Sequence, residues 1–180
     1  MPNGGGRSPG EVGQERRIPW KMITVPLVRT MPSAINIRPA AEPEIDWCAQ
    51  LMAKNDPWLT YRCSVEWSHN VLKWPGSSLF VAGAENPVGF ILLHQKGFLG
   101  SPYIAAVAVE EEFRCQQFGG RMLDFAEKIF SGSRHSYLCV SSFNSRALAL
   151  YQRHGYVKIG ELPDFIADGY CEFLMHKRLR

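Results

Sequence analysis

The chain has few cysteines, and no two of them lie close together in the sequence. The five are an odd number, scattered through 180 residues without a Cys-x-x-Cys motif: Cys48, Cys63, Cys115, Cys139 and Cys171. This pattern argues against a disulfide framework or a zinc site, and it favours reduced thiols in a cytoplasmic protein. We expect no metal ion. We also expect no membrane partner, because no apolar run approaches the length of a membrane span.

An excess of one charge is also missing from most of the chain. Residues 1–33 carry five basic and two acidic residues, and the remaining residues carry fifteen of each. A neutral body offers no electrostatic footprint for nucleic acid, so we expect no nucleic-acid partner. Glycine and proline without periodicity predict that residues 1–33 form a basic extension, disordered or loosely attached. Residues 34–180 are expected to form a single domain, as a monomer or a homodimer.

Hydrophobic periodicity, interrupted by glycine and proline, predicts a mixed α/β chain. Apolar residues at helical spacing indicate four helices: over residues 42–54 and 65–74, after the glycines at 119–120, and from residue 144. Runs rich in β-branched and aromatic residues indicate strands over residues 35–38, 79–84, 87–95, 103–109, 137–140, 156–160 and 171–177.

The strand over residues 103–109 leads into a loop and a helix start that suit an anion. Three glutamates end the strand, and the segment 113–120 follows with Gly119 and Gly120 at its end. A helix begins with free N–H groups, and glycines allow a phosphate to approach the backbone closely. We therefore expect a pyrophosphate site here, although a Gly-Gly pair alone more often serves packing or a turn.

The segment 144–156 predicts a capped helix with two polar groups facing one cleft. Asn144 suits the N-cap, apolar residues follow at helical spacing, and Gly155 ends the helix. Asn144 and Tyr151 lie seven positions apart, about two turns, and therefore on nearly the same face. That geometry lets Asn144 hold a ligand while the Tyr151 hydroxyl reaches the same cleft. The alternative is an ordinary amphipathic helix with an aromatic core residue.

With these two segments, the chain resembles the GCN5-related N-acetyltransferase (GNAT) family over about residues 35–179. The family pattern Gln/Arg-x-x-Gly-x-Gly/Ala reads here as Arg114 to Gly119, with Gln117 in place of the first glycine. The later pattern, Asn-x-x-Ala-x-x-x-Tyr and then Gly-Phe/Tyr, is matched by Asn144, Ala147, Tyr151, Gly155 and Tyr156. The resemblance implies an α/β GNAT fold, with a splayed, mostly antiparallel central sheet of about seven strands flanked by about four helices.

The resemblance also implies that acetyl-CoA is the acetyl donor and a primary amine the acceptor. The backbone of Val107, Ala108 and Val109 would pair with the pantetheine arm. The rest of the cofactor site would be Arg114, Cys115, Gln116, Gln117, Phe118, Gly119, Gly120 and Asn144. The family uses mainly backbone N–H groups in this loop, so Gln117 can serve if its backbone is ordinary helical. Tyr151 would be the general acid to the leaving thiolate, since a phenol with a pKa of about 10 is protonated at neutral pH.

The sequence does not identify the general base. In family members that acetylate the N-terminal alanine of a ribosomal protein, a glutamate lies on the strand before the asparagine helix; this chain has Cys139 there. Four titratable residues are candidates that also suit ordinary surface or core positions: Glu110, Glu66, Asp56 and His94. We favour an ordered water as the base. Direct transfer through Cys115, a thiol near a helix N-terminus, is a minor alternative.

We expect the acceptor amine beside two segments that carry aromatic and acidic residues, 56–61 and 163–168. Their charge and cation–π contacts suit a cationic amine held by Asp56, Trp58, Phe165 and Asp168. Trp58 and Phe165 suit equally a role in closing the core beneath a loop. A peptide or protein N-terminus, a polyamine, an amino acid and an aminoglycoside all stay open as acceptors. The alternative function is a catalytically weak acetyl-CoA-binding regulatory domain, which would have no chemical use for Tyr151.

Overall fold

The structure is a computed structural model that describes residues 35–180, so the expectation for residues 1–33 lies outside the described residues. The described chain contains four α-helices: α1 (Glu42–Ala53), α2 (Val65–Leu72), α3 (Phe118–Ile129) and α4 (Ser145–Arg153). Its strands are β1 (Asn36–Pro39), β2 (Ser77–Gly83), β3 (Pro87–Phe98), β4 (Ser101–Val109), β5 (His135–Ser141), β6 (Val157–Pro163) and β7 (Cys171–Arg178). The mixed α/β architecture predicted from periodicity is confirmed.

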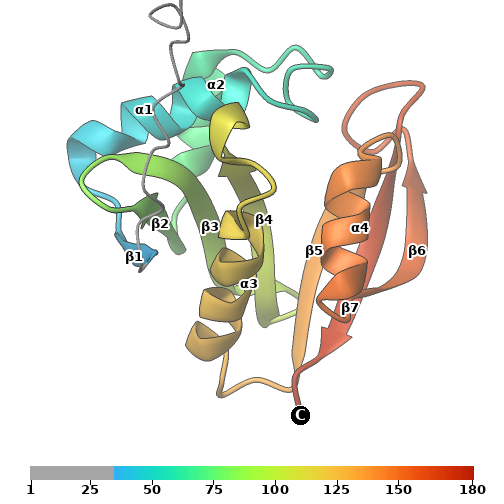
Figure 1. Ribbon diagram of the computed structural model, residues 1–180. Helices are drawn as coiled ribbons and strands as arrows, with labels where there is room; N and C mark the ends of the chain where they lie inside the picture. The colour runs from blue at the N-terminus through green and yellow to red at the C-terminus, as the bar shows by residue number, and fades with distance from the viewer. Residues whose placement is uncertain (1–34) are drawn as a thin grey trace, which may run out of the picture. The chain divides into compact units, whose positions relative to one another are not determined.

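The seven strands of residues 35–180 form one sheet that splays between β4 and β5. The strand order is β1-β2-β3-β4-β5-β7-β6, and every neighbouring pair is antiparallel except β4 with β5. The parallel pairing covers only Tyr103 with Tyr137 and Ile104 with Leu138. Beyond Ile104 the two strands diverge, as Figure 1 shows. The rest of β4 therefore has no β5 partner along the edge that faces the splay.

A β-bulge marks the point where β4 leaves β5. Leu93 pairs with Ile104 while Leu92 pairs with Ala106, so Ala105 is an extra residue in β4. A bulge of this kind shifts the side-chain alternation of a strand by one residue. Ile104 accordingly belongs to the apolar cluster beside α3 and α4, whereas Ala106 belongs to the cluster beneath α1 and α2. The bulge thus coincides with the opening of the sheet.

Each face of the sheet is covered by one pair of helices. On one face, Met122 and Leu123 of α3 are fully buried and pack with Tyr151 of α4 against the sheet. On the other face, α1 buries Cys48 and Met52 against β3 and β4. Burying these apolar stripes supplies the main stabilisation of helices that are too short to be stable alone.

Candidate functional site

A cleft of about 890 Å³ lies where β4, the N-terminus of α3 and α4 come together. It is lined by most of the residues that the sequence assigned to the cofactor: Val107, Ala108, Val109, Arg114, Cys115, Gln117, Phe118, Gly119, Gly120 and Asn144. Tyr151 lines it too. Gln116 is not among the lining residues, and its side chain instead donates to the Glu112 carbonyl at 2.9 Å. The fold therefore gathers two segments separated in sequence around one cavity.

The loop before α3 turns sharply through left-handed backbone. Gln117 precedes the first residue of α3 with φ 65° and ψ 2°, and Cys115 has φ 61°. The condition that Gln117 be ordinary helical is therefore not met. The chain must pass from extended Arg114 into the helix within a few residues, and a positive φ makes that turn. A non-glycine residue in this region costs about 1–2 kcal/mol, which glycine would avoid.

The Arg114 side chain ties this loop to the sheet and to the end of α1. Its Nε donates to the Val109 carbonyl at 3.2 Å, and its terminal nitrogen donates to the Asn55 side chain. Asn55 in turn donates to the Leu51 carbonyl at 2.6 Å, one turn back in α1. Arg114 thus holds the end of β4 and the loop in place.

The two glycines at the start of α3 allow close packing on α4. A Cβ at Gly119 would lie 3.0 Å from Leu150 Cδ2, and a Cβ at Gly120 would lie 3.1 Å from His154 Cε1. Both distances are shorter than comfortable van der Waals contact, so larger residues would push the helices apart. The glycines therefore set the width of the cleft, and they also let a ligand approach the backbone at the start of α3.

The large cleft is also lined by several cationic residues, which were not predicted from the sequence: Lys54, Arg121, Arg146 and Arg153. Carboxylates also line it: Asp56, Glu110, Glu111 and Asp124. The three arginines are exposed: Arg121 and Arg146 lie in the first turns of α3 and α4, and Arg153 is the last residue of α4. Arginines placed near two helix N-termini suit a ligand with several phosphates. Their position, within one or two turns of the recognised motifs, was the signal available in the sequence.

Asn144 and Tyr151 lie on α4 as the spacing predicted. The Asn144 side chain accepts a hydrogen bond from the Ala147 backbone at 3.1 Å, which confirms the predicted N-cap. Tyr151 is only 8% exposed, and burial, with a smaller effect of Tyr156, raises the pKa of its hydroxyl. The Tyr151 hydroxyl makes no hydrogen bond within residues 35–180. It is nevertheless not fully enclosed, because no polar side-chain atom of these residues is both enclosed and without a partner. The raised pKa keeps the Tyr151 hydroxyl protonated, and Tyr151 lines the cleft.

A second, smaller pocket of about 130 Å³ adjoins the first. The two share six residues: Asp56, Trp58, Val107, Asn144, Ala147 and Tyr151. The smaller pocket is otherwise lined mainly by side chains from β4, β5 and the α1–α2 connection, among them Tyr61, Tyr103 and Cys139. Trp67, Ile166 and Glu172 complete the lining. Burial raises the pKa of Tyr61, Tyr103 and Cys139, so these three groups are protonated at neutral pH. Tyr151 thus stands where the two pockets meet.

Glu172 of β7 is the main functional candidate that the sequence did not reveal. It lines the smaller pocket and is only 5% exposed, the only carboxylate among the buried residues of the described chain. Tyr61 donates to its Oε1, and the Tyr61 hydroxyl also lies 2.8 Å from Ser141 Oγ. Pairing of Ser141 with Glu172 across β5 and β7 puts both side chains on this face. A carboxylate beside the apolar run Phe173–Met175 of the strand was the available signal.

The predicted acceptor residues divide into two groups. Asp56 and Trp58 line both pockets, although Asp56 is exposed and accepts a hydrogen bond from Thr60 at 2.6 Å. Phe165, which is 62% exposed, and Asp168 are not among the lining residues of either pocket. The suggestion that Phe165 closes the core is therefore wrong, because its ring lies on the surface of the β6–β7 connection.

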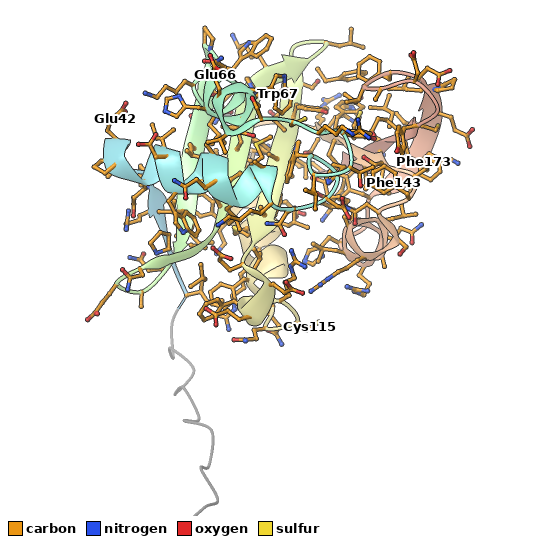
Figure 2. All side chains as sticks on the ribbon, turned by 90° about the horizontal axis from the view of Figure 1, so that it is seen from above. Glu42, Glu66, Trp67, Cys115, Phe143 and Phe173 are labelled. Carbon is orange, nitrogen blue, oxygen red and sulfur yellow. The ribbon has the colours of Figure 1, made fainter. Side chains whose placement is uncertain are left out.

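The candidate bases named from the sequence are also separated. Glu110 lines the large cleft, whereas Glu66 and His94 line neither pocket. Figure 2 shows Glu66 on α2, far from the labelled Cys115 of the α3 loop. Burial lowers the pKa of His94, so its imidazole is neutral at neutral pH. Within residues 35–180 no cluster of three or more metal-binding side chains occurs. No helix in that range has the length and apolar character needed to cross a membrane.

Comparison with known proteins agrees with this arrangement. A protein-family model described as the acetyltransferase (GNAT) family matches residues 44–156. No curated protein sequence matches the chain significantly. An aminoglycoside 6'-N-acetyltransferase complexed with coenzyme A superposes with a TM-score of 0.65 and 18% identity, covering 81% of this chain and 97% of its own. NAA60 of Arabidopsis thaliana with a bisubstrate analogue gives a TM-score of 0.67 and 19% identity, covering 82% and 100%. A nourseothricin acetyltransferase gives a TM-score of 0.54 and 23% identity, covering 59% of this chain and 67% of its own. At these identities the solved structures show a shared fold.

Proposed function

The chain belongs to the acetyltransferase (GNAT) family, and on that premise we propose that it transfers an acetyl group from acetyl-CoA directly to a primary amine. The observation that carries this proposal is the position of Tyr151. This protonated phenol lies where a large, arginine-lined cleft meets a small pocket containing a buried carboxylate. A donor and an acceptor can therefore reach the same point from two cavities, as transfer within one ternary complex requires.

The residues of the large cleft fit acetyl-CoA. The free edge of β4 beyond Ile104 leaves backbone groups of Val107 and the N–H of Val109 available to an extended pantetheine arm, while the Val109 carbonyl accepts from Arg114. The α3 N-terminus and the arginines of the cleft suit its phosphates. Bound there, acetyl-CoA would supply an activated acetyl thioester. Gln117, exposed beside the loop, restricts how closely phosphate approaches the backbone but does not fill the cleft.

Tyr151 is proposed as the general acid. Its raised pKa keeps the hydroxyl protonated over the whole range in which an amine is nucleophilic. The departing sulfur, with a thiol pKa of about 8.5, can share that proton in a short hydrogen bond, which stabilises the charge that develops on it. A cytoplasmic location also stays a proposal, which rests on the five free cysteines.

The test is release of free thiol from acetyl-CoA in the presence of a panel of amines. The panel should contain a polyamine, an aminoglycoside, free amino acids and short peptides with free N-termini, and mass spectrometry should identify acetylated products. Thiol release with an acetylated amine is the expected result. Binding of acetyl-CoA without release across the panel would instead support a regulatory acetyl-CoA-binding domain.

A further inference from the structure

We infer that Glu172 accepts the proton of the attacking amine and that the smaller pocket admits a primary amine carried on a slim, unbranched chain. This inference rests on the proposed acetyl transfer and specifies its acceptor side. It starts from the hydrogen bonding of the carboxylate. Within residues 35–180, the Glu172 carboxylate accepts one hydrogen bond, from Tyr61 to Oε1. Oε2 accepts no hydrogen bond from these residues and is not fully enclosed, and Glu172 lines the smaller pocket.

The lining of the smaller pocket favours a cation. No lysine, arginine or histidine is among its lining residues in the described chain, while Glu172 and Asp56 are. The aromatic residues Trp58, Tyr61, Trp67 and Tyr103 also line it. A carboxylate among aromatic rings, with no competing cation, attracts an ammonium group by charge and by cation–π contact. The large cleft differs, because it contains a lysine and four arginines beside its four carboxylates.

The size of the pocket limits the shape of the acceptor. Its volume of about 130 Å³ is far below the several hundred typical of whole-ligand pockets. A pocket of this size favours an amine carried on one or two methylenes over an amine on a fully substituted carbon. The body of the acceptor must then lie outside the pocket, near exposed apolar residues such as Trp67 and Ile166.

The amine and the donor approach from different sides. Trp67 of α2 lines the smaller pocket and Cys115 of the α3 loop lines the larger cleft. Figure 2 shows these two residues on opposite sides of the molecule. Tyr61, which belongs to the α1–α2 connection, contacts Phe143 and Tyr170 edge to face, with ring centroids 5.7 and 5.3 Å apart. This aromatic group fixes Tyr61, and Tyr61 in turn fixes the Glu172 carboxylate.

Glu172 is better suited to accept a proton than the other groups of the pocket. Tyr61, Tyr103 and Cys139 are protonated, and Asp56 is exposed to water. The bound ammonium group first releases one proton to water. As the resulting neutral amine nitrogen bonds to the acetyl carbon, a second of its protons becomes acidic and passes to Glu172. The carbon–sulfur bond breaks, and the Tyr151 proton passes to the sulfur. Glu172 and Tyr151 then exchange protons with water, which restores both groups.

The first test is binding of n-butylamine to the CoA-saturated protein, measured by calorimetry, with n-butanol as the neutral probe of equal length. We expect the amine to bind and the alcohol to bind far more weakly. In Glu172→Gln, which keeps an oxygen to accept from Tyr61, amine affinity should fall about 10- to 100-fold. The control Glu161→Gln removes the same charge from exposed Glu161 of β6 and should change nothing. Equal amine and alcohol binding, or equal binding to wild type and Glu172→Gln, would overturn the inference.

The second test is turnover of whichever amines the wild type acetylates. Glu172→Gln should lower kcat about 100-fold or more while the KM for acetyl-CoA stays unchanged. tert-Butylamine should be a far poorer substrate than n-butylamine. A wild-type enzyme whose Glu172→Gln variant keeps full kcat would reject Glu172 and leave the acetyltransferase proposal intact. If no amine released thiol, the proposed function would fail, and the binding test would still decide the pocket.

Discussion

Replacing Tyr151 with phenylalanine should slow acetyl transfer without loosening the fold. The Tyr151 hydroxyl has no hydrogen-bond partner within residues 35–180, so its removal breaks no bond in the folded state. Loss of a general acid typically lowers kcat about 10²- to 10⁴-fold. We therefore expect a fall in kcat of that size, acetyl-CoA affinity near that of the wild type, and a melting temperature within about 2 °C of it.

Tyr156 provides the matched control, because it lies on the same side of the sheet and differs in its bonding. Its hydroxyl shares a hydrogen bond of 2.9 Å with Ser136 Oγ, and the two residues are 1% and 0% exposed. In Tyr156→Phe the buried serine loses its partner, which costs about 1–3 kcal/mol. For a domain of this size, each kcal/mol lowers the melting temperature by about 2–4 °C. The control should therefore melt earlier and keep its kcat.

The two variants separate chemistry from packing. Calorimetric titration with acetyl-CoA, thermal melting and thiol release on both proteins are sufficient. If Tyr151→Phe lost cofactor affinity together with rate, Tyr151 would be a structural residue and its role as acid would be refuted. The same conclusion would follow if both variants lowered kcat equally.

Three other perturbations test particular parts of the structure. Gln117→Gly should tighten acetyl-CoA binding severalfold and raise the unfolding free energy by up to about 1 kcal/mol. Relief of the left-handed backbone strain exceeds the entropy that glycine adds to the unfolded chain. Calorimetry and urea denaturation measure the two effects, and no gain in either would mean that the loop is unstrained. Asn144→Ala should lower the unfolding free energy by about 1 kcal/mol, whereas Asn144→Ser should stay near the wild type. If the two variants were equally stable in urea, the capping role of the Asn144 side chain would be contradicted. Burial raises the pKa of Tyr156 to about 12 and also raises the pKa of Tyr61, Tyr103 and Tyr151. In the unfolded chain each of these tyrosines has a pKa of about 10. The unfolded chain then loses protons first, so stability should fall above about pH 10, by up to about 3 kcal/mol from Tyr156 alone; a flat urea midpoint there would count against this burial.

The elements of this fold could be predicted because their signals are local. The α1 pattern is set by apolar spacing within a dozen residues, and the α4 cap is a contact between Asn144 and the backbone three residues later. The site was partly predictable for the same reason, since two short motifs contain about half of the residues that line the large cleft. The left-handed turn at Gln117 was not predictable from residue type, because glutamine rarely adopts it.

The acceptor side of the site depends on contacts between distant residues. Tyr61 and Glu172 are 111 positions apart and meet only because β5 pairs with β7 in one register. A shift of that register by one residue would turn Glu172 to the opposite face. No local pattern contains this information. For the same reason, Phe165 was wrongly considered for the core, although the connection that carries it exposes its ring.

Calorimetric titration of the full chain with acetyl-CoA tests the central claim most directly. The account predicts saturable binding of one acetyl-CoA per chain, weakened by Arg146→Gln and Arg153→Gln because both side chains line the cleft. The same solution should release free thiol when an accepted amine is added. No binding of acetyl-CoA to the folded chain would contradict the account, because the cleft would then not be a donor site.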